Sequence, residues 1–509
     1  MSAGILGEND IVGVSDAATS DILEPGRNCM AIDRADRLSV IIDADDYFRF
    51  ARRSMVSAKR RITMIGWDFD GRIELGRDRD DDGPAKLGDF VLWLVERNPD
   101  LEIFLLRWDI GALATLQRGS TIVTVVKWMR HPRIHTKLDS AHPFGSSHHQ
   151  KIVMIDDCLA FCGGIDMTGD RWDTREHAFE DERRRRPFTR RRYKPWHDVT
   201  TAITGPVTGV IAEVCRERWA TAGGSPALVP IESASACWPS GLEPDFENVD
   251  VAISRSAPEL DERPSVREVE ELFVDQILSA KRFIYAESQY FASSKIAAAI
   301  ARRLQESGGP EIVIVNPVTA QGWLEPLAMD TARARLFEAL RRLDHEGRLR
   351  IYHPFNDGGE AIYVHAKVLI VDDRFLRIGS ANMNNRSMRL DTECDITIDA
   401  AGSPPGTGGR IAAIRNDLLG EHLGASAETV KQGIHDTGSL VATIENLRGR
   451  DRSLRPYEPP ELKDIEEWLA ENQILDPEGP EQMFEPLAKR GLLRRLPDKF
   501  SQGSKRRTR

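Results

Sequence analysis

The sequence predicts an α/β protein built from two similar lobes, each a mixed β-sheet flanked by helices, with a pseudo-two-fold relation and the active site at their interface. Three observations support this fold class. A chain of 509 residues is too long for one ordinary core. A motif of polar residues occurs twice in the same register. The segments that precede each copy also repeat.

The repeated motif combines a histidine, a lysine, an aspartate, a pair of small residues and an amide or acid at identical offsets. The first copy contains His149, Lys151, Asp156, Gly163, Gly164 and Asp166. The second copy contains His365, Lys367, Asp372, Gly379, Ser380 and Asn382. Alternate side chains of a strand share a face, so the histidine and the lysine of each copy can contact one ligand. An apolar β-branched run, an Asp-rich turn and a second apolar run predict a hairpin after each lysine.

This combination of side chains suits a phosphate group. An imidazole next to an ammonium attracts the anion, the small pair lets backbone amides approach it, and Asn382 can donate to it. Two copies supply one neutral histidine to attack phosphorus and one protonated histidine to release the leaving oxygen. No metal is required. Asp156 and Asp372 lie at an odd offset from the histidines, so we expect a structural role for them. We expect the same of Asp166, because its charge would repel phosphate.

The flanking repeats define the expected domains. Residues 44–70 and 266–291 each read as an amphipathic helix followed by a strand, and EIFLLRW (102–108) and EIVIV (311–315) are matched strands. We therefore expect a flexible N-terminus (1–28), a first lobe (29–221), a Gly-, Pro- and Ser-rich linker (222–250), a second lobe (251–459) and a helical C-terminal tail (460–509).

With these motifs the chain resembles the phospholipase D superfamily. The resemblance extends to GWDFD, GGIDMTGDRWD, PWHD, ESQYF and GSANMNNRS, and it covers most of residues 22–460. It implies a phospholipase D that hydrolyses the distal phosphodiester bond of glycerophospholipids, phosphatidylcholine above all, through a phosphohistidine, with possible transfer to other alcohols. It implies no cofactor and no metal.

The resemblance also assigns roles to residues. His149 is the expected nucleophile and His365 the expected acid, with Lys151, Lys367, Asp156 and Asp372 completing the catalytic motifs. Gly164, Ser380 and Asn382 are expected to bind substrate. Each histidine is expected to be oriented by the carboxylate that follows it in its own half, Asp198 for His149 and Glu393 for His365.

Three other functions remain open. A cardiolipin-synthase-like phosphatidyltransferase would share the phosphohistidine, but it would normally carry membrane-spanning N-terminal helices. A nuclease of the same superfamily would use the same residues, but such enzymes are commonly short dimers with one motif. An inactive lipid-binding scaffold is disfavoured because both motifs are complete. A zinc site using His148, His149 and nearby cysteines lacks a second ligand pair at a usual spacing.

Composition limits the partners and the compartment. The formal net charge of −11 argues against a dedicated nucleic-acid binder, so a phospholipid at a membrane surface is the expected partner. No signal peptide or long apolar run is evident, so we expect a protein that is cytoplasmic or peripheral to a membrane, or one that is secreted without a signal. We also expect it to be a monomer. The six cysteines are expected to be mostly buried thiols.

A basic insertion departs from the repeat. Residues 183–194, RRRRPFTRRRYK, lengthen the first half between its motif and Asp198. Such a run is often a solvated, mobile segment. The alternative is an electrostatic contact with anionic lipid head groups.

Overall fold

The structure is a computed structural model that describes residues 20–76, 80–108, 120–143, 145–232, 237–320 and 325–459. The expected C-terminal tail, 460–509, lies outside this part of the chain, as does most of the expected N-terminal segment. Residues 20–28 differ from that expectation because they pack on the second half. The Asn28 side chain is buried and donates to Asp275, 2.8 Å away, and its carbonyl accepts from Ser254.

A single sixteen-stranded mixed sheet contains both halves. The first half contributes, in sheet order, β1 (Ala31–Ile42), β8 (Val199–Thr204), β6 (Leu159–Gly163), β5 (Ile152–Ile155), β2 (Arg61–Gly66), β3 (Glu102–Trp108) and β4 (Ile134–Asp139). The second half contributes β9 (Phe246–Ala257), β17 (Glu393–Asp399), β16 (Phe375–Gly379), β15 (Val368–Val371), β11 (Phe283–Glu287), β12 (Glu311–Val315), β13 (Leu349–Phe355) and β18 (Ser453–Pro456). A short β10 (Val266–Arg267) pairs with β9. The strands predicted at 102–108 and 311–315 are confirmed.

The two halves repeat one strand order outward from a central pair. Strands β1 and β9 are antiparallel neighbours, and each is followed by the same series of partners, from β8 and β17 out to β4 and β13. The predicted two-lobe α/β design is therefore present, with the lobes joined through one sheet. Because β9 begins at Phe246, its first residues fall within the stretch expected to be a linker.

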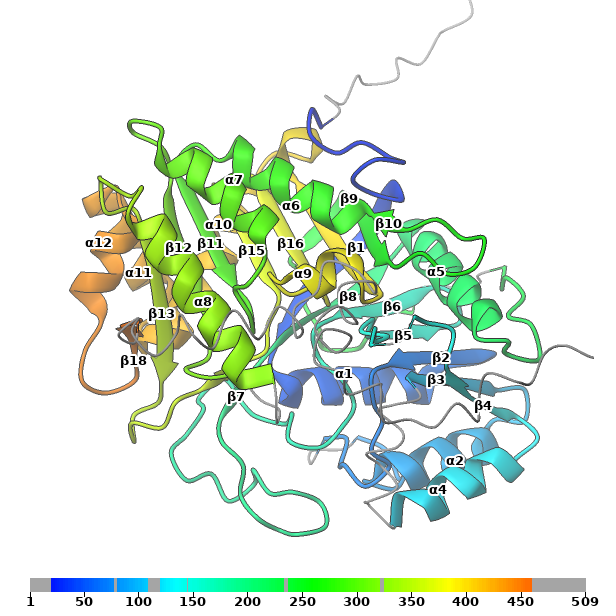
Figure 1. Cartoon of the computed structure of the whole chain (residues 1–509). Helices are drawn as coiled ribbons and strands as arrows, with labels where there is room; N and C mark the ends of the chain where they lie inside the picture. The colour runs from blue at the N-terminus through cyan, green and yellow to red at the C-terminus, as the bar shows by residue number, and fades with distance from the viewer. Residues whose placement is uncertain are drawn as a thin grey trace, which may run out of the picture.

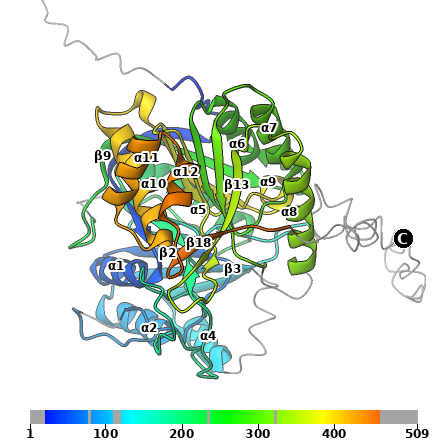
Figure 2. The same cartoon turned by 90° about the vertical axis from the view of Figure 1, so that its left-hand side faces the viewer.

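Helices cover the outer faces of both halves (Figure 1). Those of the first half are α1 (Ala44–Ser57), α2 (Leu87–Arg97), α4 (Ser120–Arg130) and α5 (Val207–Thr221). Those of the second half are α6 (Glu268–Ser279), α7 (Ser294–Leu304), α8 (Glu325–Arg341), α9 (Asn385–Arg389), the 3₁₀ turn η1 (Ala400–Gly402), α10 (Thr407–Leu423), α11 (Ala427–Thr437) and α12 (Leu440–Leu447). Figure 2 shows α10, α11 and α12 packed together, apart from α6, α7 and α8. No helix in the described ranges is both long and apolar enough to cross a bilayer.

The halves also face each other across a shared core. Apolar side chains from β1, β6 and β8 belong to the same buried cluster as those from β16 and β17. Cys162 on β6 lies 3.9 Å from Cys394 on β17, measured between sulfur atoms. The central sheet therefore folds back on itself, which brings the polar ends of the two motif hairpins together.

Two crossover contacts complete the interface. The short strands β7 (Trp196–His197) and β14 (Tyr363–Val364) pair in parallel although they belong to different halves. The chain around His148 forms a corresponding parallel bridge to Thr392. Each motif histidine is thereby carried into the opposite half.

The cysteines follow the expectation with one exception. Cys29, Cys162, Cys215 and Cys394 are buried free thiols. Cys158 instead forms a disulfide with Cys237, which ties the β5–β6 turn to the segment after α5. Sequence spacing gave no indication of this pair because the two residues are brought together only by the packing of that segment against the sheet.

Candidate active site

Each motif places its histidine and lysine just before a hairpin strand. Lys151 immediately precedes β5 and Lys367 immediately precedes β15, and both hairpins form as predicted. Lys151 Nζ donates to the carbonyl of His149 at 2.7 Å, and Lys367 Nζ donates to the carbonyl of His365. Both lysines are buried. Each ammonium group is therefore held against its own histidine, as the two-residue spacing requires.

The histidines take their carboxylate partners from the opposite half, which corrects the pairing expected from the sequence. His149 Nδ1 lies 3.0 Å from Glu393, whereas His365 Nδ1 lies 2.7 Å from Asp198. The backbone explains the exchange. The amide of His149 donates to the Thr392 carbonyl and that of His365 to the His197 carbonyl, so each histidine runs beside the other half's carboxylate. Neither Nε2 has a hydrogen-bond partner among the residues that the structure describes, so both can contact a ligand in the cavity.

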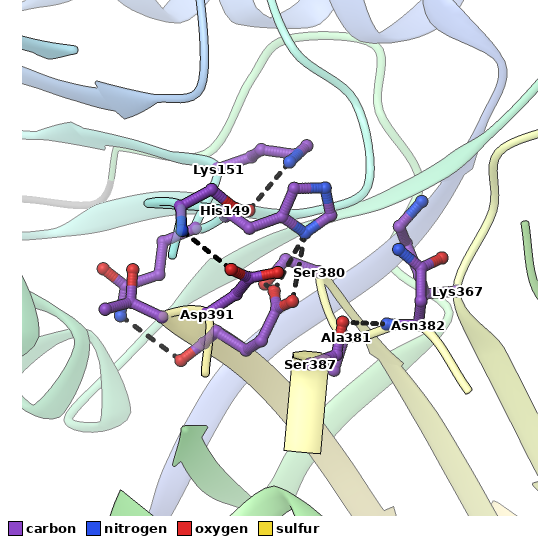
Figure 3. A network of polar contacts seen from close by, with 12 residues as sticks. His149, Lys151, Lys367, Ser380, Ala381, Asn382, Ser387 and Asp391 are labelled. Atoms are coloured by element: carbon purple, nitrogen blue, oxygen red, sulfur yellow. Dashed lines mark hydrogen bonds and ion pairs between the residues drawn. The ribbon is translucent and has the colours of Figure 1, made fainter. Parts of the chain in front are cut away.

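Ser380 supports a carboxylate, although we expected it to bind substrate. Its hydroxyl donates to Glu393 and accepts from the Cys394 amide at 3.0 Å. The side chain therefore fixes the group that orients His149. The Asn382 side chain is buried and its Oδ1 has no hydrogen-bond partner among the described residues. Figure 3 shows Asn382 and Lys367 next to the network that contains His149 and Lys151.

Asp156 and Asp372 have the structural role expected for them. Asp156 accepts from the amides of Lys59, Arg60 and Arg61 at 2.7 to 2.8 Å. Asp372 accepts in the same way from the three residues that lead into β11. Each carboxylate thus anchors the turn of its hairpin to the start of the neighbouring strand, away from the histidines. Asp166 is likewise turned to protein groups, since it pairs with Lys151 at 3.3 Å and accepts from the Trp67 amide.

The small residues at the hairpin ends allow a close approach of protein groups. A Cβ on Gly164 would lie 2.1 Å from Asp198 Oδ1, and a Cβ on Gly379 would lie 2.0 Å from Asp395 Oδ1. The amides of Gly164 and Ser380 already donate to the carbonyls of Val199 and Cys394. These amides are therefore already paired within the protein, although we expected them to bind phosphate. Gly164 and Gly379 are instead needed because a larger side chain would collide with Asp198 or Asp395.

A cavity of about 400 Å³ opens onto both histidines. The ring centroids of His149 and His365 are 6.5 Å apart, a separation that accommodates one phosphate group between them. Its wall includes side chains that the sequence analysis did not assign to the site, and these are Trp67, Trp108, Arg171, Trp196, Gln289, Tyr290, Arg386 and Asp391. The Arg171 guanidinium lies 4.1 Å from the Trp196 ring centroid and its buried Nε has no hydrogen-bond partner among the described residues.

Burial and neighbouring cations lower the basicity of both histidines. Desolvation, with the charges of Lys151 and Lys367, holds the pKa of His149 well below its usual value. Desolvation, with Lys367 and Arg171, does the same to the pKa of His365. Without a bound anion, both pKa shifts favour the uncharged form of the ring. A phosphodiester anion between them would favour the protonated form.

Burial shifts the pKa values of Asp198, Glu393 and Lys367 toward one another. Burial raises the pKa of Asp198 to about 6 and that of Glu393 well above its ordinary value. Burial lowers the pKa of Lys367 to about 7, against the opposing charge of Asp198. Shifted titration of this kind in a cleft is typical of groups that take part in acid–base chemistry.

A second buried polar cluster lies directly behind Asp198. Glu421 Oε1 lies 2.8 Å from His197 Nδ1 and 3.2 Å from His177 Nε2. The far nitrogens of these histidines meet Asp173 and Glu287, each at 2.9 Å. His177 and His197 are thus buried core histidines.

This cluster has the donor set of a cation site. Asp43, His177, His197 and Glu421 present ligand atoms within 4.8 Å of one another, and His197, Glu287 and His422 form an adjoining group. Histidines backed by carboxylates are typical of metal ligands. Two protons on the imidazoles would balance the carboxylates equally well. In that state Asp43, Asp173 and Glu421 overcome the effect of burial and raise the pKa of His177 to about 9.

We expect Glu421→Gln to lower the free energy of unfolding by about 3–5 kcal/mol, because it removes a buried charge that contacts two histidines and Arg175. Chemical denaturation measures the change. Glu428→Gln is the matched control, since Glu428 pairs with Lys431 on an exposed face of α11 and should matter by less than about 1 kcal/mol. Equal, small effects of both substitutions would show that the buried cluster contributes little to the free energy of unfolding.

Comparison with known proteins identifies the family of this chain. The family model described as "Phospholipase D" matches residues 54–303 and 350–468, and a model described as "Cardiolipin synthase, PLD-like domain" matches residues 273–403. The crystal structure of phosphatidylserine synthase from Haemophilus influenzae has a similar fold, with a TM-score of 0.52 at 13% identity over 88% of this chain and 95% of that one.

Curated relatives carry the same family name. Phospholipase D1 of Schizosaccharomyces pombe is 24% identical over 530 residues, which cover 80% of this chain and 36% of the relative. Phospholipase D alpha 1 of Arabidopsis thaliana is 25% identical over 514 residues, which cover 73% of this chain and 63% of the relative. This chain therefore spans only part of these relatives. Since the first family model matches most of its length, the chain belongs to the phospholipase D family.

Proposed function

We propose that this protein is a phospholipase D that hydrolyses the distal phosphodiester bond of glycerophospholipids, with phosphatidylcholine as the foremost substrate. The observation that carries the proposal is the arrangement of His149 and His365. Their ring centroids lie 6.5 Å apart on the wall of one cavity, and each Nδ1 is bound by a carboxylate. Oriented in this way, the two Nε2 atoms can act on opposite sides of one phosphorus.

In the first step His149 Nε2 forms a bond to phosphorus while the bond from phosphorus to the head-group oxygen breaks. His365, protonated once the phosphodiester anion is bound, donates the proton on its Nε2 to that oxygen, and the alcohol leaves. Glu393 stabilises the charge that develops on the His149 ring. Lys151, Lys367 and Asn382 stabilise the phosphate oxygens.

In the second step a water molecule gives a proton to His365 and attacks phosphorus. The bond from phosphorus to His149 breaks, phosphatidic acid leaves, and both histidines return to their starting state. An alcohol in place of water would give a transphosphatidylation product. The match to the cardiolipin synthase model favours such transfer as the second candidate function.

Incubation of the protein with phosphatidylcholine and ethanol tests the proposal. We expect phosphatidic acid, choline and phosphatidylethanol. Replacing ethanol with phosphatidylglycerol tests the second candidate, since a phosphatidyltransferase would form cardiolipin and little phosphatidic acid. Release of neither product from any glycerophospholipid would contradict both assignments.

We expect Gly164→Ala to lower kcat by about 10²-fold, because the added methyl would displace Asp198 and with it the ring of His365. Gly209→Ala on α5 is the matched control, since nothing lies within 4 Å of its added Cβ. Steady-state kinetics on both variants makes the comparison. A Gly164→Ala enzyme with normal kcat would mean that the position of Asp198 is not critical.

A further inference from the structure

The basic insertion folds into a β-hairpin. The amide of Tyr193 donates to the Arg184 carbonyl at 3.2 Å, and the amide of Arg186 donates to the Arg191 carbonyl at 2.9 Å. Arg185 and Arg192 form an antiparallel bridge between these two bonds. Residues 184–193 are therefore a defined element, which we call the basic hairpin. It therefore differs from the solvated, mobile segment that its composition suggested.

The base of the basic hairpin is fixed to the body of the protein. Arg184 is fully buried and donates to Asp173 Oδ1 at 3.0 Å, while Tyr193 donates its hydroxyl proton to the Trp172 carbonyl at 2.8 Å. Arg186 pairs with Asp170 at 2.8 Å. Arg184 and Arg186 therefore hold the base of the hairpin in place through buried or paired contacts.

The tip exposes an aromatic ring between basic residues. Phe188 is 75% exposed, more than any other large hydrophobic side chain in the described part of the chain. Arg190 and Arg191 are also exposed, and neither has a carboxylate within ion-pair distance among the residues that the structure describes. A fixed hairpin that presents an unpaired aromatic ring beside free positive charge fits a surface that is both anionic and apolar.

The basic hairpin adjoins the active site. It forms part of the wall of a cavity of about 310 Å³, to which Arg72, Lys86, Arg183, Arg185 and Arg190 contribute basic groups. Asp170 also lines this cavity, and the next residue, Arg171, lines the cavity of the two histidines. Figure 1 shows the segment between β6 and β7 extending as long loops from the lower edge of the molecule.

We propose that the basic hairpin docks the protein on an anionic lipid bilayer, with Phe188 entering the head-group region and Arg190 and Arg191 contacting lipid phosphates. The proposal rests on the proposed function, since a phospholipid substrate lies in such a surface. Phe188 favours a bilayer over a nucleic acid or an acidic protein, because an interfacial aromatic ring gains by leaving water at the head-group boundary.

Sedimentation of the full chain with vesicles tests the docking. Vesicles of phosphatidylcholine mixed with phosphatidylglycerol should bind the protein more tightly than pure phosphatidylcholine vesicles, and high salt should remove the difference. We expect Phe188→Ser to weaken binding to the mixed vesicles about tenfold. Arg190→Gln combined with Arg191→Gln should weaken it about 25-fold at low salt, from about fivefold per arginine.

Exposed residues elsewhere provide matched controls. Val229, which is 69% exposed, corresponds to Phe188, and Arg302 together with Arg335 corresponds to the arginine pair. Val229→Ser and the Arg302→Gln, Arg335→Gln double variant should bind vesicles as the unchanged protein does. Equal losses in the control and hairpin variants would overturn the proposal, because binding would then reflect overall charge.

Turnover separates docking from chemistry. On short-chain monomeric phosphatidylcholine the hairpin variants should keep the unchanged kcat/KM, whereas on mixed vesicles their kcat/KM should fall with their binding. Equal loss on both substrates would overturn the proposal in favour of a role within the active site. Weaker binding to a short oligonucleotide with unchanged vesicle binding would also overturn it. If the unchanged protein docks through the hairpin but cleaves no phospholipid, docking is supported and the proposed function fails.

Discussion

His149→Ala and His365→Ala should each lower kcat for phosphatidylcholine hydrolysis by at least about 10⁴-fold, and the double variant should be scarcely worse than either single variant. The ring centroids lie 6.5 Å apart and, in the proposed mechanism, the two rings act on one phosphorus, so removing either one should stop the same step. Head-group release measured by stopped assays with a long incubation gives the comparison. Independent contributions would instead multiply in the double variant.

His435→Ala is the control for these substitutions. His435 lies on α11 with its side chain 81% exposed, so its loss should leave kcat unchanged. The folding of each variant can be checked from its thermal midpoint, because removing a ring that lines the cavity need not destabilise the shared core. A His149→Ala or His365→Ala enzyme with near-normal kcat would end the two-histidine mechanism.

The crossed carboxylates lead to the second large effect. Asp198→Asn should impair the same half-reaction as His365→Ala, and Glu393→Gln the same one as His149→Ala, because each carboxylate binds the histidine of the opposite half. On phosphatidylcholine both variants should lose about 10²–10⁴-fold in kcat. A substrate whose leaving group needs no proton distinguishes the two variants.

Phosphatidyl-p-nitrophenol is such a substrate, since p-nitrophenolate departs unaided. With it, Asp198→Asn and His365→Ala should give a rapid burst of p-nitrophenolate followed by slow turnover. Formation of the intermediate from this substrate needs no acid, whereas its hydrolysis still needs His365 to accept a proton from water. Glu393→Gln and His149→Ala should give no burst. Asp373→Asn, at a carboxylate 46% exposed beside the second motif, should behave as the unchanged enzyme. A burst from Glu393→Gln and none from Asp198→Asn would show that the carboxylates act within their own halves.

Local rules explain how much of this site could be predicted. The two-residue spacing of His149 and Lys151 defines a shared face before any packing is known. The Asp-rich turns define the hairpins, and the odd offset of Asp156 separates it from the histidines. Because the whole unit occurs twice, a site between two copies followed from the sequence, and so did the paired strands at 102–108 and 311–315.

Other features depend on contacts between residues far apart in the chain. The pairing of β7 with β14 decides which carboxylate reaches which histidine, and nothing in the spacing of Asp198 or Glu393 encodes that exchange. The disulfide of Cys158 with Cys237 and the burial that lowers the pKa of His149 and His365 arise in the same way.

The sequence by itself determined the chemistry of the site, the duplication and the hairpins, because these depend on side-chain identity and on the short periods of strands and turns. Only the tertiary structure decided the crossed carboxylates, the support of Glu393 by Ser380 and the fixed base of the basic hairpin. Those features depend on how a sheet folds back on itself and on which groups lose water as it does so. Such information lies in the packing of the whole chain and in no single segment of it.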